Sequence, residues 1–132
     1  MLSEGFMAAW TPRLLSILRI IVGFLFIQHG TGKLFHVPHV PMFDNVALTS
    51  MIGVAGVIEV VGGALFLIGL LTRPVAFVLS GQMAAAYFIV HASQAPLPLL
   101  NGGELAVTWC FTFLYFAAAG AGPWSVDGMR RA

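Results

Sequence analysis

Residues 52–73 form an almost uninterrupted apolar run that carries one carboxyl group, Glu59, in its interior. A helix of about 20 apolar residues spans the hydrocarbon core of a bilayer. A carboxyl group in such a segment is costly to expose to lipid, so it usually faces the interior of a helix bundle and finds a partner there. This segment therefore predicts an integral membrane protein in which Glu59 points at other helices.

Two glycines lie on the helical face of Glu59. Gly56 precedes the glutamate by three residues and Gly63 follows it by four, and both spacings return to the same face of a helix. Small residues allow membrane helices to approach closely. We expect Glu59 to lie in a tight helix contact, either as a functional group or as a polar clasp that only holds the bundle together.

The composition supports a polytopic membrane protein. Of 132 residues, 59% are hydrophobic and 8% are charged, whereas soluble domains have about 25% charged residues. We predict an all-α, four-helix bundle forming a single membrane domain over residues 1–132, with spans at about 13–35, 50–71, 74–91 and 104–121. The net charge of +1 gives no sign of a nucleic-acid partner, and the one cysteine, Cys110, excludes an internal disulfide.

The chain before the first span is predicted to be a short amphipathic lead, residues 1–12. Proline is favoured in the first turn of a helix, so Thr11-Pro12 is expected to start the first helix. The lead carries Glu4 and no Lys or Arg. It therefore lacks the basic start of a signal peptide, and we expect the first span to be retained.

One face of the first span collects its ionisable residues. Spacings of three and four residues connect Arg19, Val22, Phe26, His29, Lys33 and His36. Such spacings keep residues on one side of a helix. We predict that this face meets the other helices or a polar cavity.

The connections between the spans differ in length. Residues 36–49 form the longest one and contain His36 and His39, whose spacing is a weak metal-ligand signal, so we expect a surface loop and no metal site. Thr72-Arg73-Pro74 is a tight turn in which Thr72 can cap the third helix. A turn this short makes spans two and three antiparallel neighbours.

The later spans carry isolated polar groups. Gln82 lies near the middle of the third span, and Tyr87 and His91 share a face near its end. Glu104 starts the fourth span, as a partner of the helix dipole or as a site residue. Residues 26–29 (Phe-Ile-Gln-His) are similar to residues 88–91 (Phe-Ile-Val-His), so a weak repeat of two hairpins is also considered.

Arginine placement predicts the orientation. One side of the membrane receives Arg13, Arg73, Arg130 and Arg131, and the other receives Lys33. The positive-inside rule then places both termini in the cytoplasm. Arg19, inside the first span, is expected to extend its side chain toward the cytoplasmic surface.

The outer half is predicted to hold a polar pocket. On helical rise, Glu59 lies about 13 Å and His29 about 8 Å below the outer surface, close enough for their side chains to meet. We predict that Glu59 meets His29 and Lys33 in one outward-opening pocket, with Arg19 as a rival partner for Glu59. The residues expected nearby are Gln28, Gln82, His91 and Glu104.

Three motifs carry a resemblance to a known family. His29-Gly30-Thr31-Gly32-Lys33 resembles the His-Gly-x-x-Lys motif that ends the first span of DoxX-family membrane proteins. Residues 56–63 with 69–73 are similar to that family's second-span pattern, and residues 122–127 to its Gly-Pro-x-x-Ser-x-Asp ending. The resemblance implies a four-helix protein of the bacterial inner membrane, associated with redox assemblies such as the quinone-reducing thiosulfate oxidation subunits to which DoxD belongs.

Three functions are weighed on these residues. The first is a redox-associated membrane subunit with a quinone pocket and no assigned catalysis of its own. It would act as a homo-oligomer or with partner subunits. Its His, Glu and Lys side chains suit proton exchange with a quinol. The second is a small oligomeric transport, proton-path or assembly component. The third is a haem protein with His29 and His91 as axial ligands, which is disfavoured because His91 is expected close to the surface.

Overall fold

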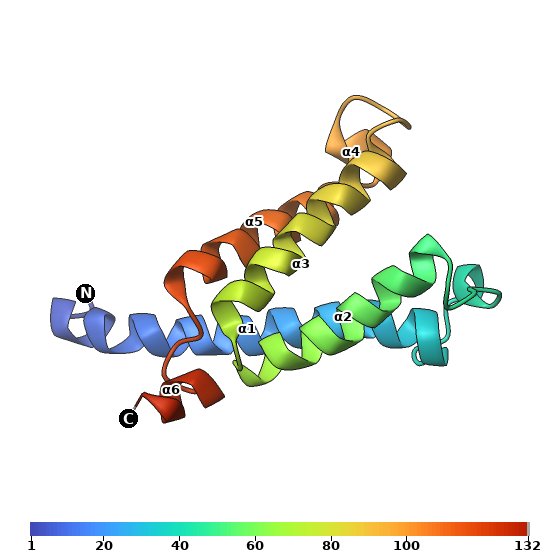
Figure 1. Cartoon of the computed structure of the whole chain (residues 1–132). Coiled ribbons are helices and arrows are strands. Elements are labelled where there is room, and N and C mark those ends of the chain that lie inside the picture. The colour runs from blue at the N-terminus through green and yellow to red at the C-terminus, as the bar shows by residue number, and fades with distance from the viewer. Residues whose placement is uncertain (132) are drawn as a thin grey trace. The chain divides into compact units, whose positions relative to one another are not determined.

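All regular elements among residues 1–131, which the computed structural model describes, are helical (Figure 1). This confirms the all-α prediction. The long helices are α1 (Glu4–Phe35), α2 (Met51–Ile68), α3 (Thr72–Ala86), which continues as the π-helical turn η2 (Tyr87–His91), and α5 (Glu104–Ala119). The short ones are η1 (Pro41–Phe43), α4 (Pro98–Asn101) and α6 (Val126–Arg130).

Three helical segments are long and apolar enough to cross a membrane: Glu4–Phe35, Met51–Ile68 and Thr72–His91. The fourth apolar helix, α5, is shorter, at 16 residues. Four apolar helices agree with the predicted four-helix membrane protein. The exact limits of the spans remain predictions.

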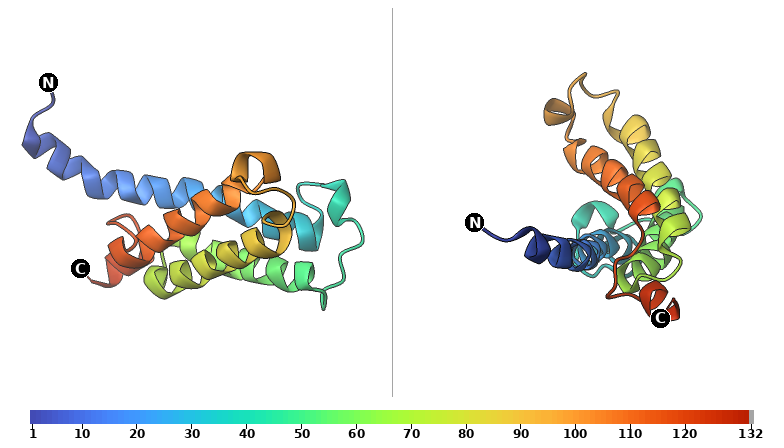
Figure 2. Two further views of the ribbon diagram at one scale, coloured as in Figure 1. Left: turned by 90° about the horizontal axis from the view of Figure 1, so that it is seen from above. Right: turned by 90° about the vertical axis from the view of Figure 1, so that its left-hand side faces the viewer.

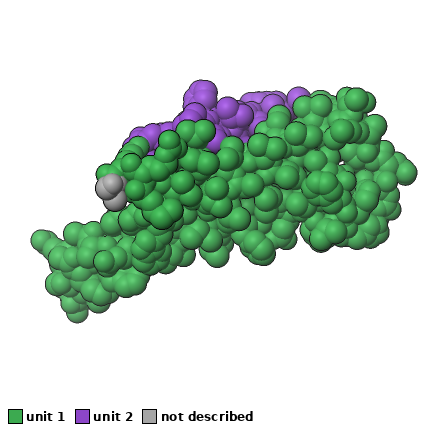
Figure 3. Space-filling model, turned by 60° about the horizontal axis from the view of Figure 1, so that its bottom comes forward, with its two compact units in different colours: residues 1–72, 121–132 green, residues 73–120 purple. Residues whose placement is uncertain are grey.

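The chain divides into two compact units (Figure 3). Unit 1 comprises Met1–Thr72 together with the chain from Ala121 onward, and unit 2 comprises Arg73–Gly120. Unit 1 is thus built from two separate stretches of sequence, with unit 2 inserted between them. Whether the units act as a single membrane domain stays a prediction.

Helix α1 begins earlier than predicted. Its first residue is Glu4, and the Ser3 hydroxyl caps it by accepting a hydrogen bond from the Phe6 amide (3.2 Å). The expected start at Thr11-Pro12 is wrong, since Pro12 lies inside the helix. A serine cap followed by an acidic first turn stabilises a helix start. Proline inside a helix removes one hydrogen bond and crowds the carbonyl four residues earlier, which bends the helix and need not end it.

Helices α1 and α2 pack through glycines on both sides of their contact. A Cβ atom at Gly30 would lie 2.7 Å from the Val60 amide nitrogen, and one at Gly23 would lie 2.9 Å from the Leu67 Cα. From the other helix, a Cβ at Gly63 would lie 3.2 Å from the Ile27 Cβ. The predicted tight contact on the glycine face of α2 is confirmed, and it brings two backbones together, as small residues permit in membranes.

The buried face of α2 consists of Gly53, Gly56, Glu59, Gly63 and Phe66. Their spacings of three and four residues keep them on one side of the helix. Glu59 is 2% exposed and lies within this face. Its burial follows from the glycines above and below it, which let α1 approach.

Substituting Gly30 and Gly81 by alanine should change stability in opposite directions. Alanine at Gly30 pushes against the backbone of α2, and overpacking of this kind costs about 1–3 kcal/mol. A Cβ atom at Gly81, in α3, would have nothing within 4 Å, so alanine there should gain about 0.5–1 kcal/mol of helix stability. Melting temperatures in lipid nanodiscs test this, and a lowered value for both variants would contradict the packing described.

Candidate functional site

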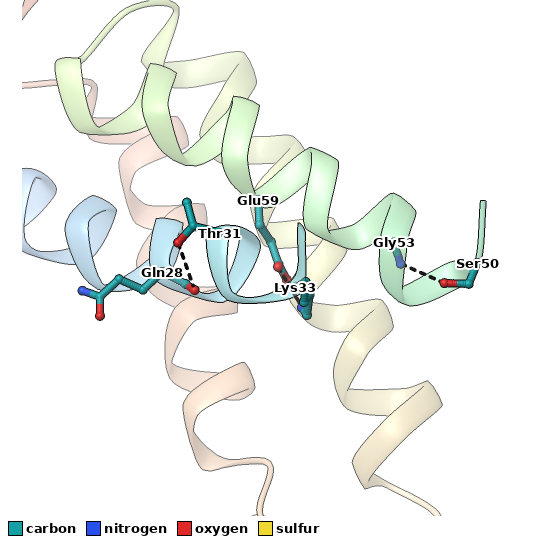
Figure 4. Close-up of polar contacts among 6 residues, drawn as sticks. All are labelled: Gln28, Thr31, Lys33, Ser50, Gly53 and Glu59. Atoms are coloured by element: carbon teal, nitrogen blue, oxygen red, sulfur yellow. Dashed lines mark hydrogen bonds and ion pairs between the residues drawn. The ribbon is translucent and has the colours of Figure 1, made fainter. Parts of the chain in front are cut away.

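Lys33 and Glu59 form an ion pair between α1 and α2 (Figure 4). The lysine Nζ lies 2.7 Å from each of the two carboxylate oxygens of Glu59. The two side chains are 13% and 3% exposed, respectively. The predicted contact between Glu59 and Lys33 is thus present in the structure.

The position of each partner follows from its helix. Lys33 lies in the last turn of α1, and Glu59 lies eight residues after the start of α2, a distance of about 12 Å along the helix. A Cβ at Gly56 would lie 3.2 Å from the Lys33 Cβ, so the glycine leaves room for the lysine side chain. A long flexible amine can then reach down to a deeper carboxylate.

Pairing is what allows both charges to be buried. A single buried carboxylate or ammonium ion is driven toward its neutral form, and separating a buried pair by removing one member costs about 3–5 kcal/mol. The loop after α1 adds a further contact, because the Lys33 Nζ lies 5.6 Å from the centre of the Phe43 ring. The aromatic ring stabilises the cation from the loop side.

The remaining part of the α1 stripe is divided between the core and the surface. Arg19, Val22 and Phe26 are buried, as predicted, while His29 and His36 are exposed. His36 ends α1 in the left-handed conformation (φ 56°) and so leaves the helical face. The stripe therefore faces the interior from Arg19 to Phe26, faces outward at His29, and faces the interior again at Lys33.

Gln28 does not point toward the ion pair. Its side-chain amide donates to the Phe24 carbonyl of its own helix (3.1 Å), and Figure 4 shows it directed away from Lys33 and Glu59. In the loop after α1, His39 Nε2 lies 2.7 Å from Asp44 Oδ1, at exposed positions. His39 and Asp44 therefore form a contact within the surface loop itself.

Gln82, His91 and Glu104 belong to unit 2. His91 Nδ1 lies 2.9 Å from the Asn101 carbonyl oxygen. Glu104 is the exposed first residue of α5, the position that suits a helix-dipole partner. The predicted membership of these three residues in one pocket with Glu59 remains a prediction.

Asn101 organises the end of unit 2, and sequence reasoning missed its role. It is 4% exposed and donates to the Tyr87 hydroxyl (3.1 Å) and to the Ala95 carbonyl (3.0 Å). Its side-chain oxygen accepts from the Gly103 amide (2.8 Å). The dipeptide Gly102-Gly103 after an asparagine was the available signal, since such sequences form turns closed by the asparagine side chain.

Arg19 is the second buried charge of unit 1, and whether its side chain extends toward the cytoplasmic surface stays a prediction. It is 1% exposed. Its guanidinium donates to the carbonyls of Leu67 (3.4 Å), Trp124 (2.7 Å) and Ala121. The last carbonyls of a helix lack intrahelical donors and carry partial negative charge, so the end of α2 attracts this cation inward.

The C-terminal segment closes the same end of unit 1. The Asp127 carboxylate accepts hydrogen bonds from the amides of Leu71 and Thr72, both at 2.9 Å. The Asp127 amide donates to the Gly69 carbonyl (2.8 Å), and the Trp124 amide donates to the Ser16 hydroxyl (3.1 Å). The capping role that sequence reasoning gave to Thr72 is thus filled by Asp127, 55 residues later in the chain.

The pKa of Asp127 reflects these contacts. Burial acts to raise the pKa of this carboxyl, but hydrogen bonds from Thr72 and Leu71 and the charge of Arg131 bring it below its ordinary value of 3.8. Donors aimed at a carboxylate favour its charged form. The ionised Asp127 is therefore part of the folded structure.

Comparison with known proteins agrees with these motifs. The DoxX family model matches residues 14–92. The chain belongs to the DoxX family. A protein of Haemophilus influenzae described as "Uncharacterized protein" is 46% identical over 122 residues, which cover 89% of this chain and 91% of that protein. No solved structure matches the chain.

Family membership and the apolar helices together describe a multi-pass membrane protein. The family match covers Lys33, Glu59 and Arg19 but ends before the C-terminal segment. The Haemophilus protein carries no functional description.

Removing one or both members of the ion pair should have different effects. Lys33→Met leaves Glu59 buried without its cation, and Glu59→Gln leaves the ammonium without its counter-charge, so each should destabilise by about 3–5 kcal/mol. The double variant Lys33→Met/Glu59→Met should recover most of that loss, since apolar replacement of a buried pair is often neutral. Melting temperatures of the wild type, the two single variants and the double variant in nanodiscs form a double-mutant cycle. If the losses of stability in the two single variants simply add in the double variant, the two side chains are not directly coupled.

Lowering the pH should reduce the folding stability of the wild type more than that of an Asp127→Asn variant. Because the pKa of Asp127 is lowered on folding, its stabilisation is complete above the unfolded value and disappears as the pH falls through the folded one. At pH 7 the variant should therefore melt at a lower temperature than the wild type, with the gap closing below about pH 3.8. Glu4→Gln, at an exposed carboxyl, is the control; a gap independent of pH would contradict the assignment.

Proposed function

We propose that this DoxX protein is a membrane subunit of a quinone-linked redox process, which binds a quinone head group for a partner subunit and performs no electron transfer itself. The observation that carries the proposal is the Lys33–Glu59 pair, a donor and an acceptor held side by side between two apolar helices. Ionisable residues inside membrane segments are rare and costly, and they commonly mark substrate, ion or proton pathways.

The chemistry of the pair suits a quinone. The Lys33 ammonium can donate to a quinone carbonyl, and the Glu59 carboxylate can accept a hydrogen bond or a proton from a quinol hydroxyl. His29, exposed one turn before Lys33, offers an imidazole that can pass a proton to water. Both helices expose apolar side chains, so the isoprenoid tail of a bound quinone would stay in the lipid beside them.

The arginine distribution supports the setting of this site. With Arg13, Arg73, Arg130 and Arg131 on the cytoplasmic side, both termini lie in the cytoplasm of a bacterial inner membrane and the Lys33 end faces outward. A single protomer of this size encloses little space, so we propose that it works as a homo-oligomer or together with redox subunits of the same membrane.

Quinone that co-purifies with the protein tests the proposal. The wild type, extracted in native nanodiscs, should carry more quinone per lipid than the surrounding membrane, measured by mass spectrometry of an organic extract. Glu59→Gln keeps the side-chain shape and removes a charged acceptor, and a hydrogen bond to a charged group contributes about 1.5–3 kcal/mol. Enrichment should then fall at least about tenfold, since 1.4 kcal/mol corresponds to a factor of ten.

Glu4→Gln makes the same chemical change at an exposed position and should keep the enrichment. If the wild type shows no enrichment, the quinone assignment is wrong. If enrichment persists in a folded Glu59→Gln variant, the pair is a clasp between α1 and α2 and the quinone binds elsewhere.

A further inference from the structure

The first turns of α1 lie outside the packed part of unit 1. Every residue before Ser16 is exposed or partly exposed, and Ser16 is the first buried residue of the chain. These turns extend beyond the end of α2, with which the rest of α1 pairs (Figure 1). Within the described residues of unit 1, residues 4–12, here called the N-terminal arm, bury no side chain, and the Pro12 carbonyl approaches Gly122.

The arm is longer than the membrane requires. The 23 residues from Arg13 to Phe35 already cover about 34 Å, enough for a hydrocarbon core of about 30 Å. If α1 continued straight, Phe6 would lie about 10 Å beyond Arg13, past a headgroup layer of about 5–7 Å. A straight arm would thus hold its apolar side chains in water.

The side chains of the arm divide into two faces. Phe6 and Met7 are 46% and 48% exposed, and helical spacing places them on one face with Trp10 and Leu14. The opposite face carries the small residues Gly5 and Ala8 together with Pro12, and Glu4 and Thr11 lie at its edge. Large apolar side chains on one face only allow a helix to lie in a membrane surface with that face toward the acyl chains.

The segment between the arm and the span contains the features that bend helices. Pro12 has no amide hydrogen to donate. The Thr11 hydroxyl donates to the Met7 carbonyl (2.8 Å), and the Ser16 hydroxyl donates to the Pro12 carbonyl (3.4 Å), contacts that favour helix bending. Figure 2 shows α1 curving at this end.

We propose that the N-terminal arm turns at Pro12 and lies along the membrane surface, where its Phe6–Trp10 face binds the boundary between lipid headgroups and acyl chains. Lipid is the occupant because the same helix enters the bilayer next to the arm. The Arg13 guanidinium lies 5.5 Å from the centre of the Trp10 ring, and Trp and Arg are both typical of the headgroup region. The charges of Glu4 and Arg13 offset each other, so the arm binds through apolar area.

Spin labels on neighbouring residues of the arm test the proposal. Met7→Cys and Ala8→Cys, each in a Cys110→Ala background of the full chain, place labels on the apolar and the opposite face, respectively. In phosphatidylcholine nanodiscs, the Met7 label should relax mainly with oxygen, which concentrates in lipid, and the Ala8 label mainly with a water-soluble nickel chelate. Adding anionic phosphatidylglycerol should leave both accessibilities unchanged.

Pro12→Ala restores the missing donor and should move the Met7 label toward water, with an unchanged melting temperature as the check on folding. If both labels in the parent protein relax mainly with the nickel chelate, the arm projects into water and the proposal is wrong. If both are shielded from both agents, a protein surface, such as a second copy of the chain, covers the arm and the lipid assignment is overturned.

Discussion

The contact between the backbones of α1 and α2 is the constraint on which unit 1 depends. Side chains of ordinary size at Gly23 or Gly30 would collide with the backbone of α2, so these glycines set the distance between the two helices. In a membrane, lipid tails are as apolar as leucine, and close packing replaces the hydrophobic effect as the source of helix association. Glu59 is buried in this contact, and Arg19 is buried where the C-terminal segment meets the end of α2.

The two buried charges are satisfied by different means at the two ends of the contact. Glu59 meets a flexible cation, Lys33, from the facing helix. Arg19 instead meets carbonyl groups at the end of α2 and in the C-terminal segment. The planar guanidinium has five donors and serves several carbonyls at once, whereas an ammonium on a flexible stem suits a single carboxylate. This difference leaves the Lys33 end as the more adaptable site and makes the Arg19 end a fixed structural joint.

Much of unit 1 could be predicted from the sequence because the relevant signals are local. The apolar runs gave the helices, and the spacing of Gly56, Glu59 and Gly63 correctly placed the carboxyl in a helix contact. The start of α1 was misplaced because Ser3 and Pro12 both resemble helix starts, and only the cap geometry separates them. The contacts of Arg19 could not be predicted because two of its partners, Ala121 and Trp124, lie more than 100 residues away. All its partners are backbone carbonyls, which every residue carries, so no residue type marks them in a sequence.

The discontinuity of unit 1 has a consequence for assembly. Arg19 enters the membrane with α1, but Ala121 and Trp124 are synthesised only after unit 2 is complete. Until then the guanidinium has only the Leu67 carbonyl from this set of partners. A charged side chain inside a membrane segment is costly without partners, so the paired α1 and α2 remain an incomplete unit. The C-terminal segment brings the Trp124 carbonyl to Arg19 and the Asp127 carboxylate to the turn after α2, and so completes the set of partners that Arg19 has in the folded unit.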